Sequence, residues 1–229
     1  MKILYSGGMV VAGSGKMQGT VFAKGRSGAV ARVRVKPINP NTNKQVSQRS
    51  KLSTRSSAWR SLTEAQRAGW NEAANSGQWP LKNALGVTFQ PTGAQLYNQL
   101  NLNLSKIEAV AITAAPQKAT LPAILLTGLT GTAGTPTLSL AYDGSPDSAD
   151  KLVVYATPQL SPGISRPGRS KYRLLTVLAD DSPQSILSAY TAQFGALVAG
   201  QKVFVYAEVV HSATGQAASA GSAVAVIGA

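Results

Sequence analysis

The N-terminal third of the chain is organised around one stretch, which reads Arg32-Val33-Arg34-Val35-Lys36-Pro37-Ile38-Asn39-Pro40-Asn41-Thr42. Cations alternate with valines and then give way to a run rich in proline and asparagine. This run cannot form a regular helix, because each proline fixes its own φ and pushes the preceding residue toward an extended conformation. The stretch has no carboxylate, histidine or cysteine for acid–base or nucleophilic chemistry. It therefore predicts an extended basic arm that lies along another macromolecule.

The positive charge of the chain is concentrated in the same region. The 229 residues carry a net charge of +13, and residues 1–82 contain 14 of the 22 lysines and arginines but only two acids, Glu64 and Glu72. Residues 83–229 contain the other 8 cations against 7 acids, so that part is nearly neutral. Such asymmetry is typical of a basic arm attached to a globular part. We expect the partner of the arm to be acidic, through either phosphates or protein carboxylates.

The composition limits the kind of protein further. The chain has no cysteine, which excludes a disulfide framework and thiolate metal sites. The start, Met1-Lys2-Ile3-Leu4-Tyr5, reaches glycine too soon to form the apolar core of a secretory signal, and no apolar run approaches the length of a membrane span. We expect a protein that folds inside the cell that makes it and has no membrane partner.

The residues ahead of the proline run have the pattern of a β-hairpin. Side-chain types alternate from Gly15 to Lys36, with a break at Lys24-Gly25-Arg26-Ser27-Gly28. The second strand places Arg32, Arg34 and Lys36 on one face, because side chains two apart point the same way. Three cations alone favour a solvated strand face. The absence of any acid ahead of Glu64 favours a partner-binding face instead.

Three helical segments are predicted after the proline run. Gln45 to Trp59 has the three- and four-residue spacing of a basic helix or helical turn. The run Thr63-Glu64-Ala65-Gln66 is a capping-box pattern and predicts a helix that ends at about residue 74. A second capping-box pattern, Thr92-Gly93-Ala94-Gln95, opens the third helix.

Two tryptophans accompany these helices. Trp59 and Trp70, with Leu62, can close a small apolar cluster between short helices. We favour this core role over an aromatic platform for stacking bases, because a platform would need the rings to be exposed.

The second half of the chain has a different pattern. Residues 109–137 are rich in Ala, Thr, Pro and Gly and are interpreted as a linker that passes into the first strands. Beyond it lie five predicted strands, Thr137–Tyr142, Lys151–Thr157, Tyr172–Ala179, Lys202–Val210 and Ser222–Ile227. Many short strands separated by turn-rich loops predict an immunoglobulin-like or fibronectin-III-like sandwich.

The predicted fold class is therefore α+β and mainly β. A basic arm with a β-hairpin spans residues 1–62, a helical segment spans residues 63–110, and the immunoglobulin-like β-sandwich spans residues 111–229.

No residue pattern predicts catalysis. The single histidine, His211, ends a predicted strand, where a solvent-facing side chain is the default. Gly13-Ser14-Gly15-Lys16 lacks both the first glycine and the final Ser or Thr of a phosphate-binding loop. Asp143, Asp147 and Asp150 lack the glycine and glutamate of an EF-hand and are interpreted as a polar turn. We expect no catalytic residue, metal, cofactor or small-molecule substrate, and an enzyme with paired carboxylates is the least favoured alternative.

The arm supplies the candidate partner-binding residues. They are Lys24, Arg26, Arg32, Arg34, Lys36, Pro37, Asn39, Pro40, Asn41, Gln45, Arg49, Arg55 and Trp59. If the arm binds phosphates rather than a protein, its affinity should fall steeply with salt. The one basic spot in the second half, Arg166-Pro167-Gly168-Arg169-Ser170-Lys171, is interpreted as a solvated loop or a secondary contact.

A longer pattern runs through the first third of the chain. Its parts are Gly15-Lys16, Gly19-Thr20-Val21-Phe22, Arg26-Ser27-Gly28, Arg32, Lys36-Pro37-Ile38-Asn39-Pro40-Asn41-Thr42, Gln45, Arg49, Trp59-Arg60-Ser61-Leu62-Thr63, Gln66-Arg67 and Trp70-Asn71. In combination they resemble uncharacterised structural proteins of tailed phages and prophages. The C-terminal half is similar to the sandwich domains that often follow this pattern, through Tyr190, Phe194-Gly195, Gly200-Gln201-Lys202-Val203-Phe204-Val205 and Thr214-Gly215-Gln216.

The resemblance implies a non-enzymatic virion component that is made in the host cytoplasm, and it brings no catalytic residues. We expect an auxiliary capsid protein that cements or decorates a phage head. Its partners would be the major capsid protein and other copies of itself, bound through many weak contacts. A neck or tail position and a nucleic-acid-binding role are the alternatives.

Overall fold

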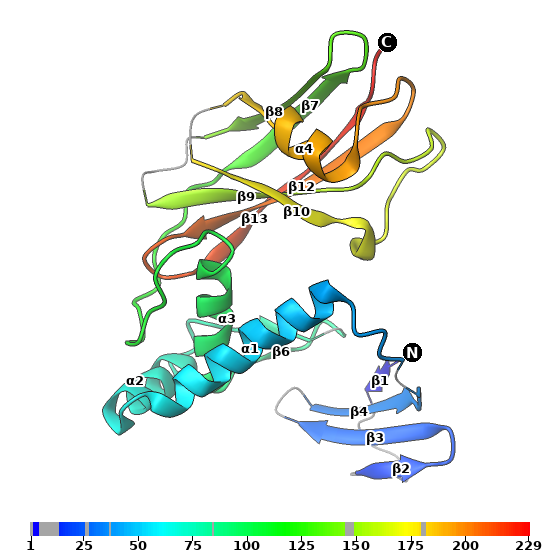
Figure 1. Ribbon diagram of the computed structural model, residues 1–229. Helices are drawn as coiled ribbons and strands as arrows, with labels where there is room; N and C mark the ends of the chain where they lie inside the picture. The colour runs from blue at the N-terminus through cyan, green and yellow to red at the C-terminus, as the bar shows by residue number, and fades with distance from the viewer. Residues whose placement is uncertain are drawn as a thin grey trace. The chain divides into compact units, whose positions relative to one another are not determined.

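A computed structural model describes residues 2–4, 14–25, 28–36, 38–83, 85–144, 149–179 and 182–229. The chain forms two compact units (Figure 1). The N-terminal unit comprises Met1–Leu102 with Thr113–Ala115, and the C-terminal unit comprises Asn103–Ile112 with Pro116–Ala229. The mixture of helices and antiparallel sheets confirms the α+β part of the predicted fold class. The predicted boundary at residue 62 falls inside the N-terminal unit, and the boundary at residue 110 falls in the segment 103–115 that contributes to both units.

The N-terminal unit begins with a four-stranded antiparallel sheet. Its strands are β1 (Lys2–Leu4), β2 (Gly15–Met17), β3 (Thr20–Gly25) and β4 (Gly28–Val33), in the order β1-β4-β3-β2. The predicted hairpin is confirmed for β3 and β4, which pair along their whole length. Its first strand is nevertheless interrupted, because Gln18, with a φ of 46°, turns the chain between β2 and β3.

The second strand of the hairpin is shorter than predicted. It ends at Val33 rather than at Lys36, although the Arg34 N–H still donates to the Gly19 carbonyl at 2.6 Å. Arg34 and Lys36 therefore lie beyond the strand. The prediction that Arg32, Arg34 and Lys36 share one strand face is wrong, because only Arg32 belongs to β4. Residue 37 is a proline, which could not have donated to a continued ladder.

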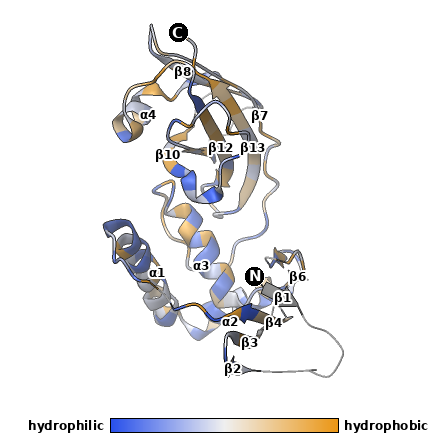
Figure 2. Ribbon diagram, turned by 90° about the vertical axis from the view of Figure 1, so that its right-hand side faces the viewer, coloured by the Kyte–Doolittle hydropathy of each residue, from blue (hydrophilic) through white to orange (hydrophobic). Residues whose placement is uncertain are grey.

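Helix α1 (Asn43–Ser61) begins two residues earlier than the spacing of its side chains indicates. Thr42 is its N-cap: the Gln45 N–H donates to Thr42 Oγ1 at 3.4 Å, and the Thr42 N–H donates to Gln45 Oε1 at 3.3 Å. This capping box satisfies backbone groups that would otherwise lack partners. No residue of the 19-residue helix is buried, and Figure 2 colours most of it toward the hydrophilic end.

Helices α2 (Glu64–Asn75) and α3 (Gly93–Leu104) start at the two predicted capping boxes. The Gln66 N–H donates to Thr63 Oγ1 at 3.3 Å, and the Gln95 N–H donates to Thr92 Oγ1 at 3.2 Å. A short hairpin of β5 (Leu81–Lys82) and β6 (Thr88–Phe89) separates the two helices in sequence.

The three helices meet at Tyr97 of α3. Its ring centroid lies 5.4 Å from that of Trp59 in α1 and 5.3 Å from that of Trp70 in α2, the second pair being edge-to-face at 88°. Trp70 is fully buried, and its Nε1–H donates to the Thr113 carbonyl at 2.8 Å. Leu62 is buried as well. The tryptophans thus have a packing role, with Tyr97 as the residue that joins them.

The C-terminal unit consists of two antiparallel sheets. Their orders are β11-β8-β7 and β10-β9-β12-β13. The elements are β7 (Leu125–Thr132), β8 (Thr137–Asp143), β9 (Asp150–Ala156), the 3-10 helix η1 (Arg169–Lys171), β10 (Arg173–Leu178), β11 (Gln184–Ser185), α4 (Leu187–Phe194), β12 (Lys202–His211) and β13 (Ala217–Val226). The five predicted strands are confirmed. The first strand, β7, lies inside the segment that was interpreted as a linker passing into strands.

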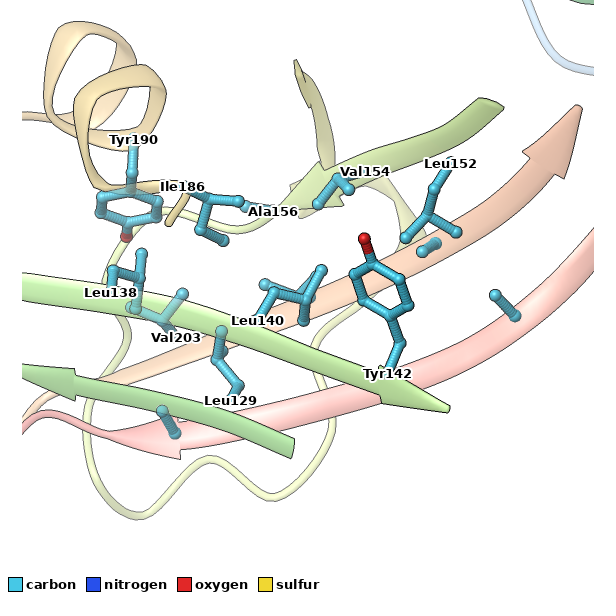
Figure 3. Packing of buried hydrophobic residues seen from close by; sticks show 14 of the residues in the cluster. Leu129, Leu138, Leu140, Tyr142, Leu152, Val154, Ala156, Ile186, Tyr190 and Val203 are labelled. Carbon is cyan, nitrogen blue, oxygen red and sulfur yellow. The ribbon is translucent and has the colours of Figure 1, made fainter. Parts of the chain in front are cut away.

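The core of this unit lies between the two sheets. Figure 3 shows Leu140 and Tyr142 of β8 on the side that faces Leu152 and Val154 of β9, and Leu138 of β8 close to Tyr190. These side chains of β8 and β9 are at most 5% exposed. On one side of this core, Tyr190 of α4 is also buried, and its hydroxyl donates to the Thr157 carbonyl at 3.0 Å. Burial of the phenol raises its pKa.

Candidate functional site

Residues 32–44, which we call the strap, comprise the last two residues of β4, the connecting segment and the first two residues of α1. All of its described residues are exposed, and Ile38 reaches 91%. Pro37 lies outside the described residues. Val33, Val35 and Ile38 are exposed apolar side chains, and they are interspersed with Arg32, Arg34 and Lys36. The strap therefore offers a surface that is both cationic and apolar.

The middle of the strap is held against α1 by one arginine. Arg49 Nη2 donates to Asn39 Oδ1 at 2.6 Å, and Nη1 donates to Asn41 Oδ1 at 3.2 Å. The planar guanidinium presents its donors in a fixed fork, which suits two acceptors side by side. Asn41 has a φ of 51°, a left-handed conformation that asparagine tolerates better than most residues. Three of the predicted binding residues are thus brought together by contacts with one another.

The other predicted residues of α1 make contacts within the chain. Gln45 belongs to the capping box, and Trp59 packs against Tyr97. Arg55 is half-buried near Tyr97: burial raises the pKa of that phenol, and the charge of Arg55 opposes the rise. Arg26 lies outside the described residues, as does the side chain of Lys24. Pro40 is exposed in the strap.

The cations of the arm have no carboxylate partner among the described residues. The two ion pairs found there, Lys106–Glu208 and His211–Asp150, both lie in the C-terminal unit. Lys16, Arg32, Arg34, Lys36, Lys44, Arg49 and Lys51 are all exposed. Unpaired like charges along an extended segment repel one another, so an acidic partner would relieve this repulsion.

The histidine differs from its predicted state. His211 Nδ1 lies 3.1 Å from Asp150 Oδ1, and the exposed fractions of the two side chains are 19% and 6%. The two residues are paired in the register of β12 and β9. The expectation of a solvent-facing histidine is wrong, because strand pairing places it beside a buried carboxylate. Asp150 correspondingly begins β9 and does not belong to a polar turn.

Two other aspartates, Asp143 and Asp147, belong to the segment that was interpreted as a polar turn. Asp143 is exposed at the end of β8, whereas Asp147 lies outside the described residues. Among the residues that the structure describes, no group of three His, Cys, Asp or Glu side chains could hold a metal ion.

A second concave surface lies on the outer face of the four-stranded sheet of the C-terminal unit. This groove has a volume of about 690 Å³ and is lined by Tyr155, Ser165, Arg166, Pro167, Arg169, Tyr172, Phe204, Tyr206, Glu208, Ser222, Ala223 and Val224. Sequence reasoning identified the basic loop that contributes Arg166 and Arg169. It did not identify the tyrosines, because Tyr155 and Tyr206 lie in two predicted strands whose pairing the sequence does not specify.

The tyrosines of the groove surround Glu208. Its carboxylate is 3.0 Å from Lys106 Nζ, and it accepts from the Tyr206 hydroxyl at 3.2 Å and from the Tyr155 hydroxyl at 3.4 Å. Burial raises the pKa of Tyr155, Tyr172 and Tyr206. Burial disfavours the charged form of Lys106, but Glu208 and Tyr155 together outweigh that effect, so the pKa of Lys106 is raised. The carboxylate is therefore neutralised by a neighbour and its oxygens are occupied.

No helix in the described part of the chain has the length and apolarity needed to cross a membrane. A scan against protein-family models, a search of curated proteins and a search of solved structures found no match to this chain.

Proposed function

We propose that the chain is a non-enzymatic structural component of a tailed-phage virion, in which the strap and α1 lie across neighbouring capsid proteins. In this role it is an auxiliary capsid protein that cements or decorates the head. The observation that carries the proposal is the strap, whose described residues are all exposed and combine unpaired cations with apolar side chains. An extended segment of this kind provides contact area to a partner without a core of its own.

Helix α1 supports the same role. Most helices in proteins are stabilised mainly by packing of an apolar face rather than by intrinsic propensity. No side chain of α1 is buried by the described part of the chain. Much of the helix surface is therefore available to a neighbouring protein. At about 1.5 Å per residue its 19 residues span about 28 Å, a length that suits a contact along a capsid surface.

The apolar part of the strap favours a protein partner over nucleic acid. Phosphate binding needs cations, but it gives no reason to expose Val33, Val35 and Ile38 between them. Protein interfaces, in contrast, bury apolar side chains at their centre and place charges at the rim. A nucleic-acid role is the second candidate, favoured by the unpaired cations alone.

For the C-terminal unit we propose an immunoglobulin-like sandwich of the fibronectin-III type. The order of the strands supports this assignment. If the strands β7 to β13 are taken as A, B, C, C′, E, F and G, the two sheets become A-B-E and C′-C-F-G, as expected for such a domain. In a virion this unit would project from the surface or bridge to neighbouring copies.

The proposal is tested by incorporation into particles. In the cells that produce the chain, Arg32→Glu, Arg34→Glu and Lys36→Glu are introduced together, and purified heads and tails are analysed separately by mass spectrometry. We expect the unaltered chain in heads and a loss of the variant of about tenfold or more. The control, Lys118→Glu with Lys151→Glu and Lys171→Glu, changes the charge equally outside the arm and should be incorporated normally.

Three outcomes would contradict it. Absence of the unaltered chain from all particles would contradict a virion role, and its presence only in tails would contradict the head assignment. Equal loss of the control would show that net charge matters rather than the strap. Filter binding of the purified chain to DNA at low and high salt tests the second candidate, because phosphate contacts must weaken steeply with salt.

A further inference from the structure

The groove on the outer face of the four-stranded sheet is built independently of the arm. Its floor comes from β9, β12 and β13, and its wall comes from the loop between β9 and β10 that contains η1. The ring centroids of Tyr155 and Tyr206 lie 5.9 Å apart, and those of Tyr172 and Tyr206 lie 6.4 Å apart. The three rings thus form a continuous aromatic surface, although they come from separate parts of the sequence.

The wall of the groove is a structured loop. The Ile164 N–H donates to the Ser161 carbonyl at 3.0 Å, and the Lys171 N–H donates to the Gly168 carbonyl at 3.0 Å. Lys202 Nζ, from β12, reaches the Ile164 carbonyl at 3.4 Å. These contacts hold the backbone that carries Arg166 and Arg169, so the loop itself needs little rearrangement when a ligand arrives. Preorganised groups bind with a smaller loss of conformational entropy.

The charge that the groove offers to a ligand is positive. Glu208 is neutralised by Lys106 at 3.0 Å and is occupied by two phenols. Arg166 and Arg169 are exposed and have no ion-pair partner among the described residues. Arg166 and Arg169 line the groove together with Tyr172 and Tyr206. The groove therefore presents flat apolar faces, hydroxyl groups and two cations.

We propose that this groove binds an acidic saccharide. The C–H faces of a sugar ring can pack on tyrosine rings, its hydroxyls can bond to Ser165, Ser222 and the Tyr172 hydroxyl, and its carboxylate can accept a bidentate pair from an arginine. A volume of about 690 Å³ is within the range of sites for small ligands. This inference goes beyond the structural role of the arm and does not depend on it.

The same geometry indicates binding without cleavage. Hydrolysis of a glycosidic bond needs two carboxyl groups on either side of that bond. Glu208 is the one carboxylate in the lining of the groove, and its oxygens are already engaged. A single-stranded nucleic acid is a poorer fit, because it would need a track of cations along its backbone, whereas the lining contributes two.

The experiment is isothermal titration calorimetry of the full chain with a short oligogalacturonate, a neutral maltooligosaccharide of equal length and a single-stranded oligothymidylate. We expect the acidic sugar to bind at least about tenfold more tightly than the neutral one, because only it can engage the arginines. The double variant Arg166→Ala with Arg169→Ala should lose about tenfold or more in affinity. The control Lys118→Ala with Lys171→Ala removes equal charge outside the lining and should change affinity by less than about twofold.

A second variant separates the aromatic surface from the charge. Tyr172→Leu keeps an apolar side chain but removes the ring, and it should weaken binding of the acidic sugar while the arginines remain. Circular dichroism confirms that each variant is folded. No binding of the acidic sugar at millimolar concentration, equal binding of the neutral sugar, or equal loss in the lysine control would overturn the proposal.

Two further results separate this proposal from others. Preferential binding of oligothymidylate that the arginine variant abolishes would assign the groove to nucleic acid instead. The strap variant with three glutamates should bind the sugar like the unaltered chain. Failure of the arm proposal and failure of the groove proposal are therefore distinguishable.

Discussion

Arg49, in the second turn of α1, reaches back ten positions and donates from Nη2 to Asn39 Oδ1 at 2.6 Å. Its other terminal nitrogen donates to Asn41. The contact is exposed, so its contribution to global stability is small. Its effect is local, since it limits the directions in which the strap can leave α1.

The first prediction concerns this contact. Arg49→Lys replaces a planar fork by a point charge that cannot hold two amides together, so residues 38–42 should exchange their amide hydrogens faster. The unfolding midpoint should change little, because each bond is solvent-exposed. Hydrogen exchange measured by mass spectrometry tests this expectation. Lys51→Ala, an exposed cation two residues further on, is the control and should leave the exchange unchanged.

Tyr97 is the second test position. Tyr97→Ala removes the ring between Trp59 and Trp70 and should destabilise the N-terminal unit by about 3–5 kcal/mol. The three tryptophans of the chain, Trp59, Trp70 and Trp79, all belong to that unit, so tryptophan fluorescence during urea unfolding reports on it selectively. Tyr97→Phe keeps the ring and should stay within about 1 kcal/mol of the unaltered chain. Equal effects of the two variants would contradict the packing role.

Two glycines make a matched pair for the third prediction. A Cβ on Gly93 would lie 2.8 Å from the Asn71 nitrogen and 2.9 Å from the Trp70 carbonyl carbon, so Gly93→Ala must push α3 away from α2. We expect a loss of about 1–3 kcal/mol. A Cβ on Gly69, inside α2, would meet nothing within 4 Å, and Gly69→Ala should stabilise by about 0.5–1 kcal/mol. Urea unfolding measures both variants, and the same sign for the two would contradict the close approach of the helices.

The fourth prediction concerns the His211–Asp150 pair. His211→Ala leaves the carboxylate of Asp150, 6% exposed, without this partner and should destabilise the C-terminal unit by about 1–3 kcal/mol. Asp150→Ala combined with His211→Ala should cost less than the sum of the single changes, because the second change removes the orphaned group. Thermal unfolding followed by circular dichroism gives the coupling. Additive effects would show that the two side chains do not interact.

The fifth prediction is a loss of stability at alkaline pH. Burial raises the pKa of Tyr155, Tyr172, Tyr190 and Tyr206 above the ordinary value of 10.0, and the pKa of Lys106 is raised above 10.5. The folded chain therefore keeps protons that the unfolded chain releases. The stabilising contribution of these groups is complete below about pH 10 and is lost as the pH rises through the folded-state pKa values.

Urea unfolding between about pH 8 and about pH 11 measures this slope. Tyr190→Phe removes one of the contributing groups and should make the decline less steep. A decline that began well below pH 10, or a stability that rose with pH in this range, would contradict the assignment.

Elements whose signals are local could be predicted from the sequence. Thr63 with Gln66 and Thr92 with Gln95 determine their helix starts through bonds between residues three apart, and both capping boxes formed. Thr42 and Gln45 carry the same local signal for the start of α1, whereas the periodicity of the side chains alone predicts a start two residues later. The strands from β8 onward were predictable because β-branched and aromatic residues gather in short runs between turns.

Features that depend on long-range packing could not be predicted. The groove combines residues from β9, β12, β13 and the β9–β10 loop, and only the order of the strands brings them to one surface. The pairing of His211 with Asp150 likewise depends on the register of β12 against β9, which brings together two residues that are 61 positions apart in the sequence. The turn at Gln18 was missed because a positive φ at a non-glycine residue has no clear signal in the alternating pattern.

Because no side chain of α1 is buried, selection for folding places few demands on most of its surface. Replacements along its solvent side can accumulate with little thermodynamic penalty, as long as Trp59 keeps its position against Tyr97. Substitutions on that side of the helix therefore leave the packing around Tyr97 unchanged. The exposed surface of α1 can therefore change its binding properties by substitution while the buried residues of the N-terminal unit stay the same.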